Sequence, residues 1–315
     1  MDELILHHYP MSPFAEKARL MLGAKGLAWR SVIIPAVMPK PDVLALTGGY
    51  RKTPLLQIGA DIYCDTALIA RVLESRQPMP SLYPASAPLA AALAQWADRL
   101  LFWPVATVAM QPAGAAALLR NPSPETVKAF RSDRAAFTQG MARPSLSDAL
   151  AALNAALPAL EAQLQQAASA DAWLLGSDVS IADFAVAHQL WFIRQAGPVA
   201  EVLAPYPALN AWLDRVLALG HGRSQPMDSA EAVAVAAAAS AAGRHATVAV
   251  AAGQGLEAGE PVSVAATDYG QDPSPGLLVG LDDHEVVIRR DDPRAGTVQV
   301  HFPRSGFQIR KENKA

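Results

Sequence analysis

The order of apolar segments in the first eighty residues constrains this chain more than any other feature. Strand spacing and helical spacing alternate there, which predicts the order β-α-β-α-β-β-α and an α/β domain over residues 1–80. Gly59-Ala60-Asp61 separates the third and fourth strands and is short enough for a hairpin. The predicted elements are Leu4–Leu6, Pro13–Lys25, Trp29–Ile34, Pro41–Leu46, Thr53–Ile58, Ile62–Cys64 and Thr66–Glu74.

The sequence pattern changes twice more along the rest of the chain. The length of 315 residues also favours more than one domain. Residues 86–222 have helical spacing almost throughout, which predicts an all-helical domain. Within it, Ser180 and Asp183 have the spacing of a capping box at the start of a buried helix. Residues 223–244 are rich in alanine and predict a helical linker. Residues 245–315 contain short strand-like segments between Gly, Pro and Asp clusters, which predict a small all-β barrel or sandwich.

Composition and charge exclude several classes of function. The chain is 51% hydrophobic and 17% charged with a net charge of −3, so it offers no basic surface for nucleic acid. We find no signal peptide, and the alanine-rich run 230–242 is far shorter than a membrane span, so we expect a cytoplasmic protein without membrane contact. The single cysteine, Cys64, excludes an intramolecular disulfide, and the histidines lack metal-ligand spacing, so we expect no metal.

Ser12 is the first candidate for chemistry, because it stands where the first strand turns into the first helix. Pro13 suits the first helical position and Ser12 suits the N-cap. The positive end of a helix stabilises an anion, and a hydroxyl at the cap can donate a hydrogen bond that lowers the pKa of a thiol. Taken alone, however, Ser12 is better explained as a plain helix cap.

Two further short motifs are suited to a peptide-like ligand. Thr53-Pro54 lies just before a strand, and a cis bond there would turn the backbone N–H and C=O of Thr53 outward to pair with a ligand. Asp65-Thr66 ends a strand and opens a helix. We expect Thr66 to cap this helix, its N–H groups to receive a carboxylate and Asp65 to face an ammonium group, although a plain helix cap would look the same.

Together the three motifs have the order and spacing of the glutathione transferase superfamily. Tyr9–Arg19, with the sequence YPMSPFAEKAR, resembles the omega-type and tau-type segment in which the residue before Pro-Phe is a catalytic Cys or Ser. Lys52–Leu56 resembles the family's strand entry with its cis-proline, Asp65-Thr66 resembles its Glu/Asp-Ser pair, and Ser180–Asp183 resembles its capping box. The resemblance covers roughly residues 3–220 and implies a thioredoxin-like N-terminal domain followed by an all-α domain. The all-β region lies outside it.

The resemblance implies a role for each motif. Ser12 would be the catalytic residue that activates the glutathione thiolate, and Asp65 and Thr66 would hold the γ-glutamyl end. Lys52 and Lys40 would meet the glycine carboxylate. Because serine cannot exchange disulfides, conjugation is preferred to thiol reduction. The residues that the resemblance implies for glutathione binding are Phe14, Lys40, Lys52, Thr53, Pro54, Asp65 and Thr66.

Three further residues have competing explanations. Tyr9 is an alternative hydroxyl donor, as in some members of the superfamily, although Pro10 follows it. Trp103 and Met110 lie on the helix that faces the electrophile in relatives, and they are our candidates for a hydrophobic substrate pocket. Packing in the helical core is nevertheless the favoured explanation for both.

The sequence therefore predicts a glutathione S-transferase that joins the glutathione thiolate to a small hydrophobic electrophile in detoxification, with isomerisation or dehalogenation as variants. The resemblance implies a homodimer. The alternative is a non-catalytic binding or scaffold protein that uses the C-terminal β region for partner recognition. The sequence does not identify the electrophile, because the second site consists of generic apolar helices.

Overall fold

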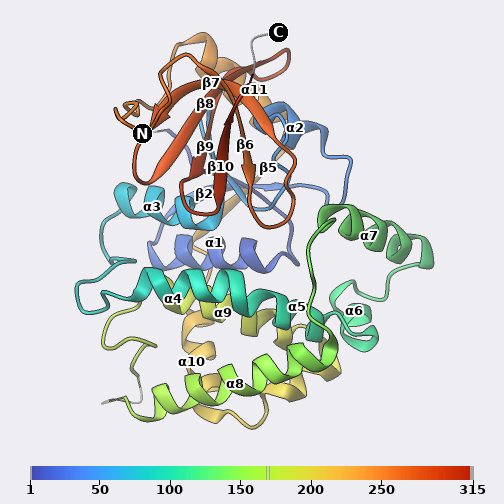
Figure 1. The fold of residues 1–315 in the computed structure, drawn as a ribbon. Coiled ribbons are helices and arrows are strands. Elements are labelled where there is room, and N and C mark those ends of the chain that lie inside the picture. The colour runs from blue at the N-terminus through green and yellow to red at the C-terminus, as the bar shows by residue number, and fades with distance from the viewer. Residues whose placement is uncertain (1, 168, 170, 313–315) are drawn as a thin grey trace.

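The computed structural model describes residues 2–167, 169 and 171–312. Residue 1 of the predicted N-terminal domain, residues 168 and 170 of the predicted helical domain and residues 313–315 of the predicted all-β region lie outside the described residues. Figure 1 shows a sheet with its own helices above a layer of longer helices. The C-terminal strands, drawn in orange and red, lie beside the N-terminal sheet rather than apart from it.

The N-terminal domain has the predicted order of strands and helices and the expected thioredoxin-like fold. β1 pairs in parallel with β2 and antiparallel with β3, which in turn pairs antiparallel with β4. Gly59 and Ala60 connect β3 to β4, and Gly59 has a φ of 60°, which glycine adopts at little cost. The elements are β1 (Ile5–His8), α1 (Pro13–Ala24), β2 (Ala28–Ile33), α2 (Pro41–Thr47), β3 (Leu55–Ile58), β4 (Asp61–Cys64) and α3 (Thr66–Arg76).

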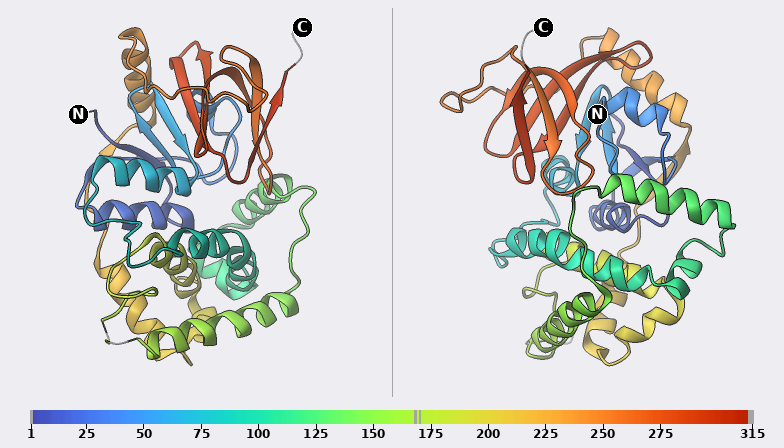
Figure 2. Two further views of the ribbon diagram at one scale, coloured as in Figure 1. Left: turned by 60° about the vertical axis from the view of Figure 1, so that its left-hand side comes forward. Right: turned by 45° about the vertical axis from the view of Figure 1, so that its right-hand side comes forward.

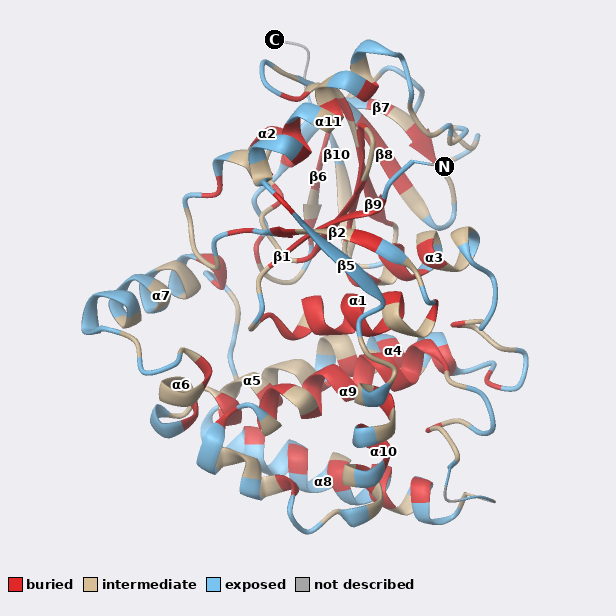
Figure 3. Cartoon of the chain, turned by 180° about the vertical axis from the view of Figure 1, so that it is seen from behind, coloured by how far each residue is buried: buried red, intermediate tan, exposed pale blue. Residues whose placement is uncertain are grey.

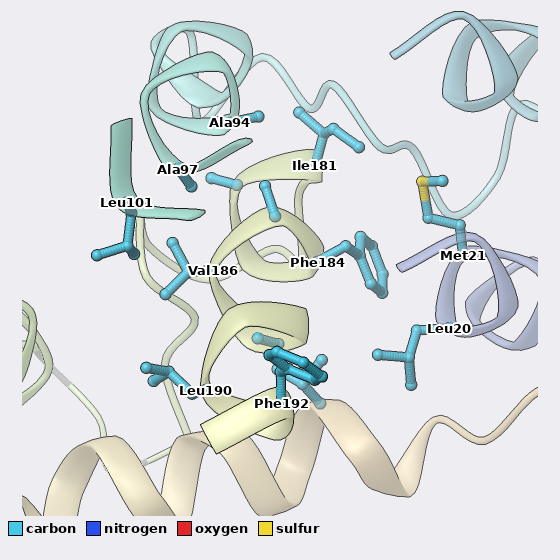
Figure 4. Packing of buried hydrophobic residues seen from close by; sticks show 14 of the residues in the cluster. Leu20, Met21, Ala94, Ala97, Leu101, Ile181, Phe184, Val186, Leu190 and Phe192 are labelled. Atoms are coloured by element: carbon cyan, nitrogen blue, oxygen red, sulfur yellow. The ribbon is translucent and has the colours of Figure 1, made fainter. Parts of the chain in front are cut away.

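The helical domain surrounds one almost completely buried helix, α9. Ser180 and Asp183 form the predicted capping box at its start, and the Asp183 carboxylate also accepts from Trp212 Nε1 at 2.9 Å. Figure 4 shows Phe184 of α9 pointing toward Leu20 and Met21 of α1, so the two domains share a core. The elements are α4 (Ala90–Trp96), a π-helical turn (Ala97–Leu101), α5 (Phe102–Ala109), α6 (Pro112–Leu118), α7 (Pro124–Phe137), α8 (Leu146–Gln165), α9 (Ile181–Arg194), a 3₁₀ segment (Gly197–Leu203) and α10 (Pro207–Ala218).

None of the helices in the described part of the chain is, by itself, both long and apolar enough to cross a membrane. One pair, Ala90–Ala109 with Pro112–Leu118, meets that test jointly by length and composition, but it bends by 97° at its break. Ala97, Leu101 and Val105 of this pair are buried in the helical core.

The last third of the chain extends the N-terminal sheet at both edges. β5 pairs in parallel with β2, and β9 pairs in parallel with β4. The result is a ten-stranded sheet with the order β10-β6-β7-β8-β9-β4-β3-β1-β2-β5. Figure 2 shows how strongly its C-terminal part curls. The elements are β5 (Arg223–Met227), α11 (Ser229–Ala241), β6 (Pro261–Ala266), β7 (Ser274–Leu281), β8 (Glu285–Asp292), β9 (Gly296–Pro303) and β10 (Phe307–Lys311).

The two faces of the N-terminal strands belong to two different cores. Side chains alternate along a strand, so Leu6 of β1 faces α1 and the helical domain while Ile5 faces the opposite side. On that opposite side, Ile5 shares a core with α2, α11 and strands of the C-terminal region, including the fully buried Phe302 of β9. The C-terminal strands are therefore part of the architecture that positions the predicted ligand residues.

Candidate functional site

Ser12 occupies the N-cap of α1, and Pro13 takes the first helical position. The Ser12 Oγ accepts a hydrogen bond from Ala15 N at 3.2 Å. Its hydroxyl hydrogen donates to no partner within the described residues, so it is available for a ligand. The side chain is only 3% exposed, however, and Ser12 does not line the cavity that the neighbouring motifs form.

Thr53 and Pro54 precede β3, and the peptide bond between them is cis. Lys40 lies beside this bond, because its Nζ donates to Thr53 Oγ1 at 3.3 Å and to Arg51 O at 3.2 Å. Burial of Lys40, together with the nearby Arg134 guanidinium, lowers the pKa of the Lys40 ammonium to about 8, although Asp133 acts in the opposite direction. Lys40 is buried and does not line the cavity.

Asp65, and not Thr66 as expected, caps α3. Its Oδ1 accepts from Ala67 N at 2.9 Å, and Thr66 is the first helical residue. The expectation was wrong because both side chains are good caps, and the turn after β4 puts the backbone of Asp65 at φ 72°, outside the helix. A non-glycine residue with positive φ is uncommon and concentrates at functional sites. Burial raises the pKa of the Asp65 carboxyl, and the Ala67 N–H and the Lys52 ammonium offset this only in part.

The N-terminus of α3 opens into a cavity of about 60 Å³. Six of the predicted binding and catalytic residues line it together, whereas Ser12, Lys40, Trp103 and Met110 do not. The remaining lining comes from Tyr50, from the π-helical turn and the helix before it, and from the C-terminal β region. The six predicted residues are Phe14, Lys52, Thr53, Pro54, Asp65 and Thr66.

Lys52 has a partner that the sequence did not predict. Its Nζ lies 2.6 Å from Asp268 Oδ1 and 3.9 Å from the centre of the Tyr269 ring. Burial lowers the pKa of Lys52, and the facing Asp268 carboxylate only partly offsets this. The cation that we expected to meet the glycine carboxylate is therefore already paired with a carboxylate of the chain itself.

Asp98 is a second acidic lining residue that sequence reasoning missed. It lies in the π-helical turn, and π-helical turns are frequent at functional sites. Lys17 Nζ binds its Oδ2 at 2.5 Å and His188 Nε2 lies 3.1 Å from its Oδ1. Burial would raise the pKa of Asp98, but these two partners outweigh burial and lower it. Lys17 and His188 are far apart in the sequence, so no local motif signals this cluster.

The two candidates for a hydrophobic pocket have different surroundings. Trp103 is half-buried and meets Tyr269 edge-on, with ring centres 5.0 Å apart, so it contacts the C-terminal β region. Met110 is partly buried and packs on the core of the helical domain. Tyr9 lies on the Lys40 side, where the Lys40 Nζ is 5.8 Å from its ring centre.

In the part of the chain that the structure describes, no three His, Cys, Asp or Glu side chains come together as a metal site. Cys64 lies fully buried in β4, and burial raises the pKa of its thiol well above the ordinary value. A neutral, inaccessible thiol is a poor nucleophile. Cys64 is therefore not a candidate nucleophile at this site.

Comparison with known proteins agrees with this geometry. Residues 6–81 match the family model of the glutathione S-transferase N-terminal domain, and residues 129–215 match that of the C-terminal domain. A solved structure of a GST-like protein from Pseudomonas syringae is 41% identical, with a TM-score of 0.77, over 99% of this chain and all of that one. A glutathione S-transferase from Rhodospirillum rubrum F11 shares the fold, at 23% identity and a TM-score of 0.51, over 68% of this chain and 87% of its own.

One curated relative has a name that states a cellular location instead of a transferase activity. FtsZ-localized protein A from Caulobacter vibrioides is 29% identical over 203 residues, which cover 62% of this chain and 80% of that protein. That alignment is too short to include the whole of this chain. The Pseudomonas structure, in contrast, matches the chain over nearly its full length, C-terminal strands included. From the two domain matches and this full-length likeness, the chain belongs to the glutathione S-transferase family.

Proposed function

We propose that the protein binds glutathione and transfers its sulfur to a small hydrophobic electrophile. The observation that carries the proposal is the shared cavity: residues from three separate segments of the N-terminal domain line one space at the N-terminus of α3. A helix N-terminus with free N–H groups suits a carboxylate, and the partly buried Asp65 carboxylate beside it suits an ammonium group. A γ-glutamyl end carries both charges on one carbon.

Ser12 supplies the chemistry in this proposal. Its Oγ accepts from Ala15 N, and its hydroxyl hydrogen has no acceptor among the described residues, so it can donate to a bound thiolate. That donor and the positive end of α1 stabilise a thiolate, so the bound thiol loses its proton at a lower pH than the free thiol does. The thiolate then forms a C–S bond with the electrophilic carbon, and the leaving group departs with its electron pair.

The test is Ser12→Ala, with turnover of chlorodinitrobenzene as the readout. Loss of one donor to a developing or bound anion costs about 10²-fold in kcat. We expect that loss together with an unchanged Kd for glutathione and a pH–rate profile displaced to higher pH. Ser123→Ala is the matched control, because Ser123 also caps a helix with Pro at its first position. That helix is α7 of the helical domain, and Ser123 is exposed there, whereas Ser12 is buried in the N-terminal domain. If both variants keep full activity, Ser12 has no catalytic role.

A non-catalytic binding or scaffold protein is the second candidate. Two observations favour it: the cavity is small and Ser12 is outside its lining, and one relative has a name that gives a location and no reaction. In that case the C-terminal β region would be the recognition surface. Calorimetry would then show glutathione binding while a panel of electrophiles shows no turnover above the uncatalysed rate.

We further propose that the protein works as a cytoplasmic homodimer in detoxification, as the family resemblance implies. Light scattering coupled to size-exclusion chromatography measures the mass directly. A particle with twice the mass of one chain is the expected result, and a monomer at all concentrations would contradict it.

A further inference from the structure

The loop between β6 and β7, residues 267–273, lies over the site from the far end of the chain. Asp268 and Tyr269 of this loop line the cavity together with Lys52, Asp65 and Thr66. The cavity that remains has about 60 Å³, whereas small-molecule sites typically have about 300–1,000 Å³. The enclosed space that the loop leaves is therefore well below that of a typical small-molecule site.

Two side chains of the loop resemble the ligand groups that the site would bind: a carboxylate beside Lys52 and an aromatic ring among aromatic side chains. Asp268 places a carboxylate 2.6 Å from Lys52 Nζ, which is the place that a ligand carboxylate would take. The Tyr269 ring lies among aromatic side chains, with centre distances of 5.0 Å to Trp103 and 5.1 Å to Phe137. A hydrophobic electrophile with an aromatic ring would make the same kind of contact with these side chains that the Tyr269 ring makes.

The ends of the loop are fixed by the sheet, and its middle is held mainly by side-chain contacts. Asp268 pairs with Lys52, Asp272 pairs with Arg51, and the Tyr269 ring packs among aromatic rings. Ser274, at the start of β7, is buried and its Oγ accepts from Tyr50 N at 3.0 Å. In the middle, Gly270 N donates to Phe137 O at 2.8 Å. Gly270 has a φ of 58°, and a Cβ there would lie 2.4 Å from the Phe137 ring, so only glycine allows this approach. Thr267 and Gln271 on either side are exposed.

We propose that Asp268 and Tyr269 compete with glutathione for the site. When glutathione binds, loop 267–273 moves out, the ion pair between Asp268 and Lys52 breaks, and Lys52 pairs with the ligand carboxylate instead. The inference rests on the proposed glutathione site. Because only the open fraction of molecules binds, the apparent affinity for glutathione is lower than the intrinsic affinity by that fraction. Any change that weakens the loop contacts therefore tightens binding.

Calorimetric titration of the full chain with glutathione tests this directly. Asp268→Asn removes the charge that competes for Lys52, and we expect the variant to bind glutathione about tenfold more tightly than the wild type does. Asp283→Asn is the matched control, since Asp283 is an exposed carboxylate in the turn between β7 and β8, and its Kd should not change. Gly270→Ala, which pushes the loop off Phe137 without changing charge, should tighten binding in the same direction.

A second ligand shows which subsite Asp268 fills. Glutathione monoethyl ester carries no charge at its glycine end and gains little from a released Lys52. Asp268→Asn should therefore improve binding of the ester by much less than binding of glutathione. Equal gains for both ligands would mean that Asp268 does not compete for the carboxylate subsite, and the inference would be overturned.

Hydrogen exchange of the backbone gives an independent readout. Saturating glutathione should raise the exchange rate of amides 267–272 while α3 becomes more protected. If the loop becomes more protected instead, it closes over the ligand and is not a competitor. Unchanged affinity in both loop variants beside normal wild-type binding would overturn this inference alone, whereas absence of binding in all proteins would overturn the glutathione site as well.

Discussion

The two edges of the N-terminal sheet are both covered by the last third of the chain, but in unlike ways. At the β2 edge, β5 contributes backbone pairing, and four of its five side chains, Arg223–Pro226, are exposed. Figure 3 shows this strand in the colour of exposed residues across the back of the molecule. At the β4 edge, β9 brings the buried side chains Val300, His301 and Phe302.

The difference shows that β5 is mostly a surface strand, whereas β9 is a core strand. β5 is held by backbone pairing and by the single buried side chain of Met227, so its other side chains can change freely. β9, in contrast, is fixed by packing along much of its length and by the His301 contact to β4. Deletion of the C-terminal region would expose the shared core, so it is a poor test of function, and point substitutions are needed.

The largest expected effect comes from Phe302→Ala. The ring is fully buried and packs against Tyr50 at 5.8 Å and Phe307 at 5.5 Å between centres. Truncation of a buried phenylalanine costs about 3–5 kcal/mol in the free energy of unfolding. Urea unfolding of the whole chain measures it, and a loss below about 1 kcal/mol, in the range of ordinary surface changes, would mean that β9 is not a core strand.

His301 tests the same edge through pH. Burial alone would lower its pKa, but the hydrogen bonds with Asp61 and Glu285 outweigh burial and raise it above 6.5. Its contribution to stability is thus fully present below the unfolded pKa and is lost as the pH rises through the folded pKa. His301→Gln should cost about 1–3 kcal/mol at pH 6 and clearly less at pH 9.

The control for His301 is His284→Gln, because His284 is exposed in the turn before β8. His284→Gln should leave the free energy of unfolding of the protein unchanged at both pH values. A cost of His301→Gln that is equal at both pH values would show that the charge on the imidazole plays no part in joining β9 to β4. The ring contact with Tyr63, 4.4 Å between centres, would then be the remaining explanation.

The smallest effect is expected at the opposite edge. Ser224→Ala in β5 removes an exposed side chain and leaves the backbone pairing with Trp29 intact. The free energy of unfolding should change by less than about 0.5 kcal/mol, measured in the same urea titrations. A loss that approaches that of Phe302→Ala would remove the distinction between the two edges.

Local patterns explain why much of the fold was predictable. The strands and helices of the N-terminal domain follow from spacing within each segment, and the capping box at Ser180 and Asp183 lies within four residues. β5 was missed because Arg223–Met227 has no alternation of apolar residues and only Met227 is buried. β10 lies outside the four strands that the sequence predicted in this region, because its side chains are at most partly buried. Those four strands are Val262–Val264, Leu277–Leu281, Glu285–Arg289 and Thr297–Phe302.

The amino-acid sequence by itself determined the order of the elements in the N-terminal domain, the Ser12 cap and the short motifs that line the cavity, because each depends on neighbours within a few residues. Tertiary structure decided which residue caps α3 and that Lys52 is paired with Asp268, 216 positions away. It also decided that the β region continues the sheet instead of standing apart. Contacts of this kind depend on how distant segments pack, and no local spacing encodes them.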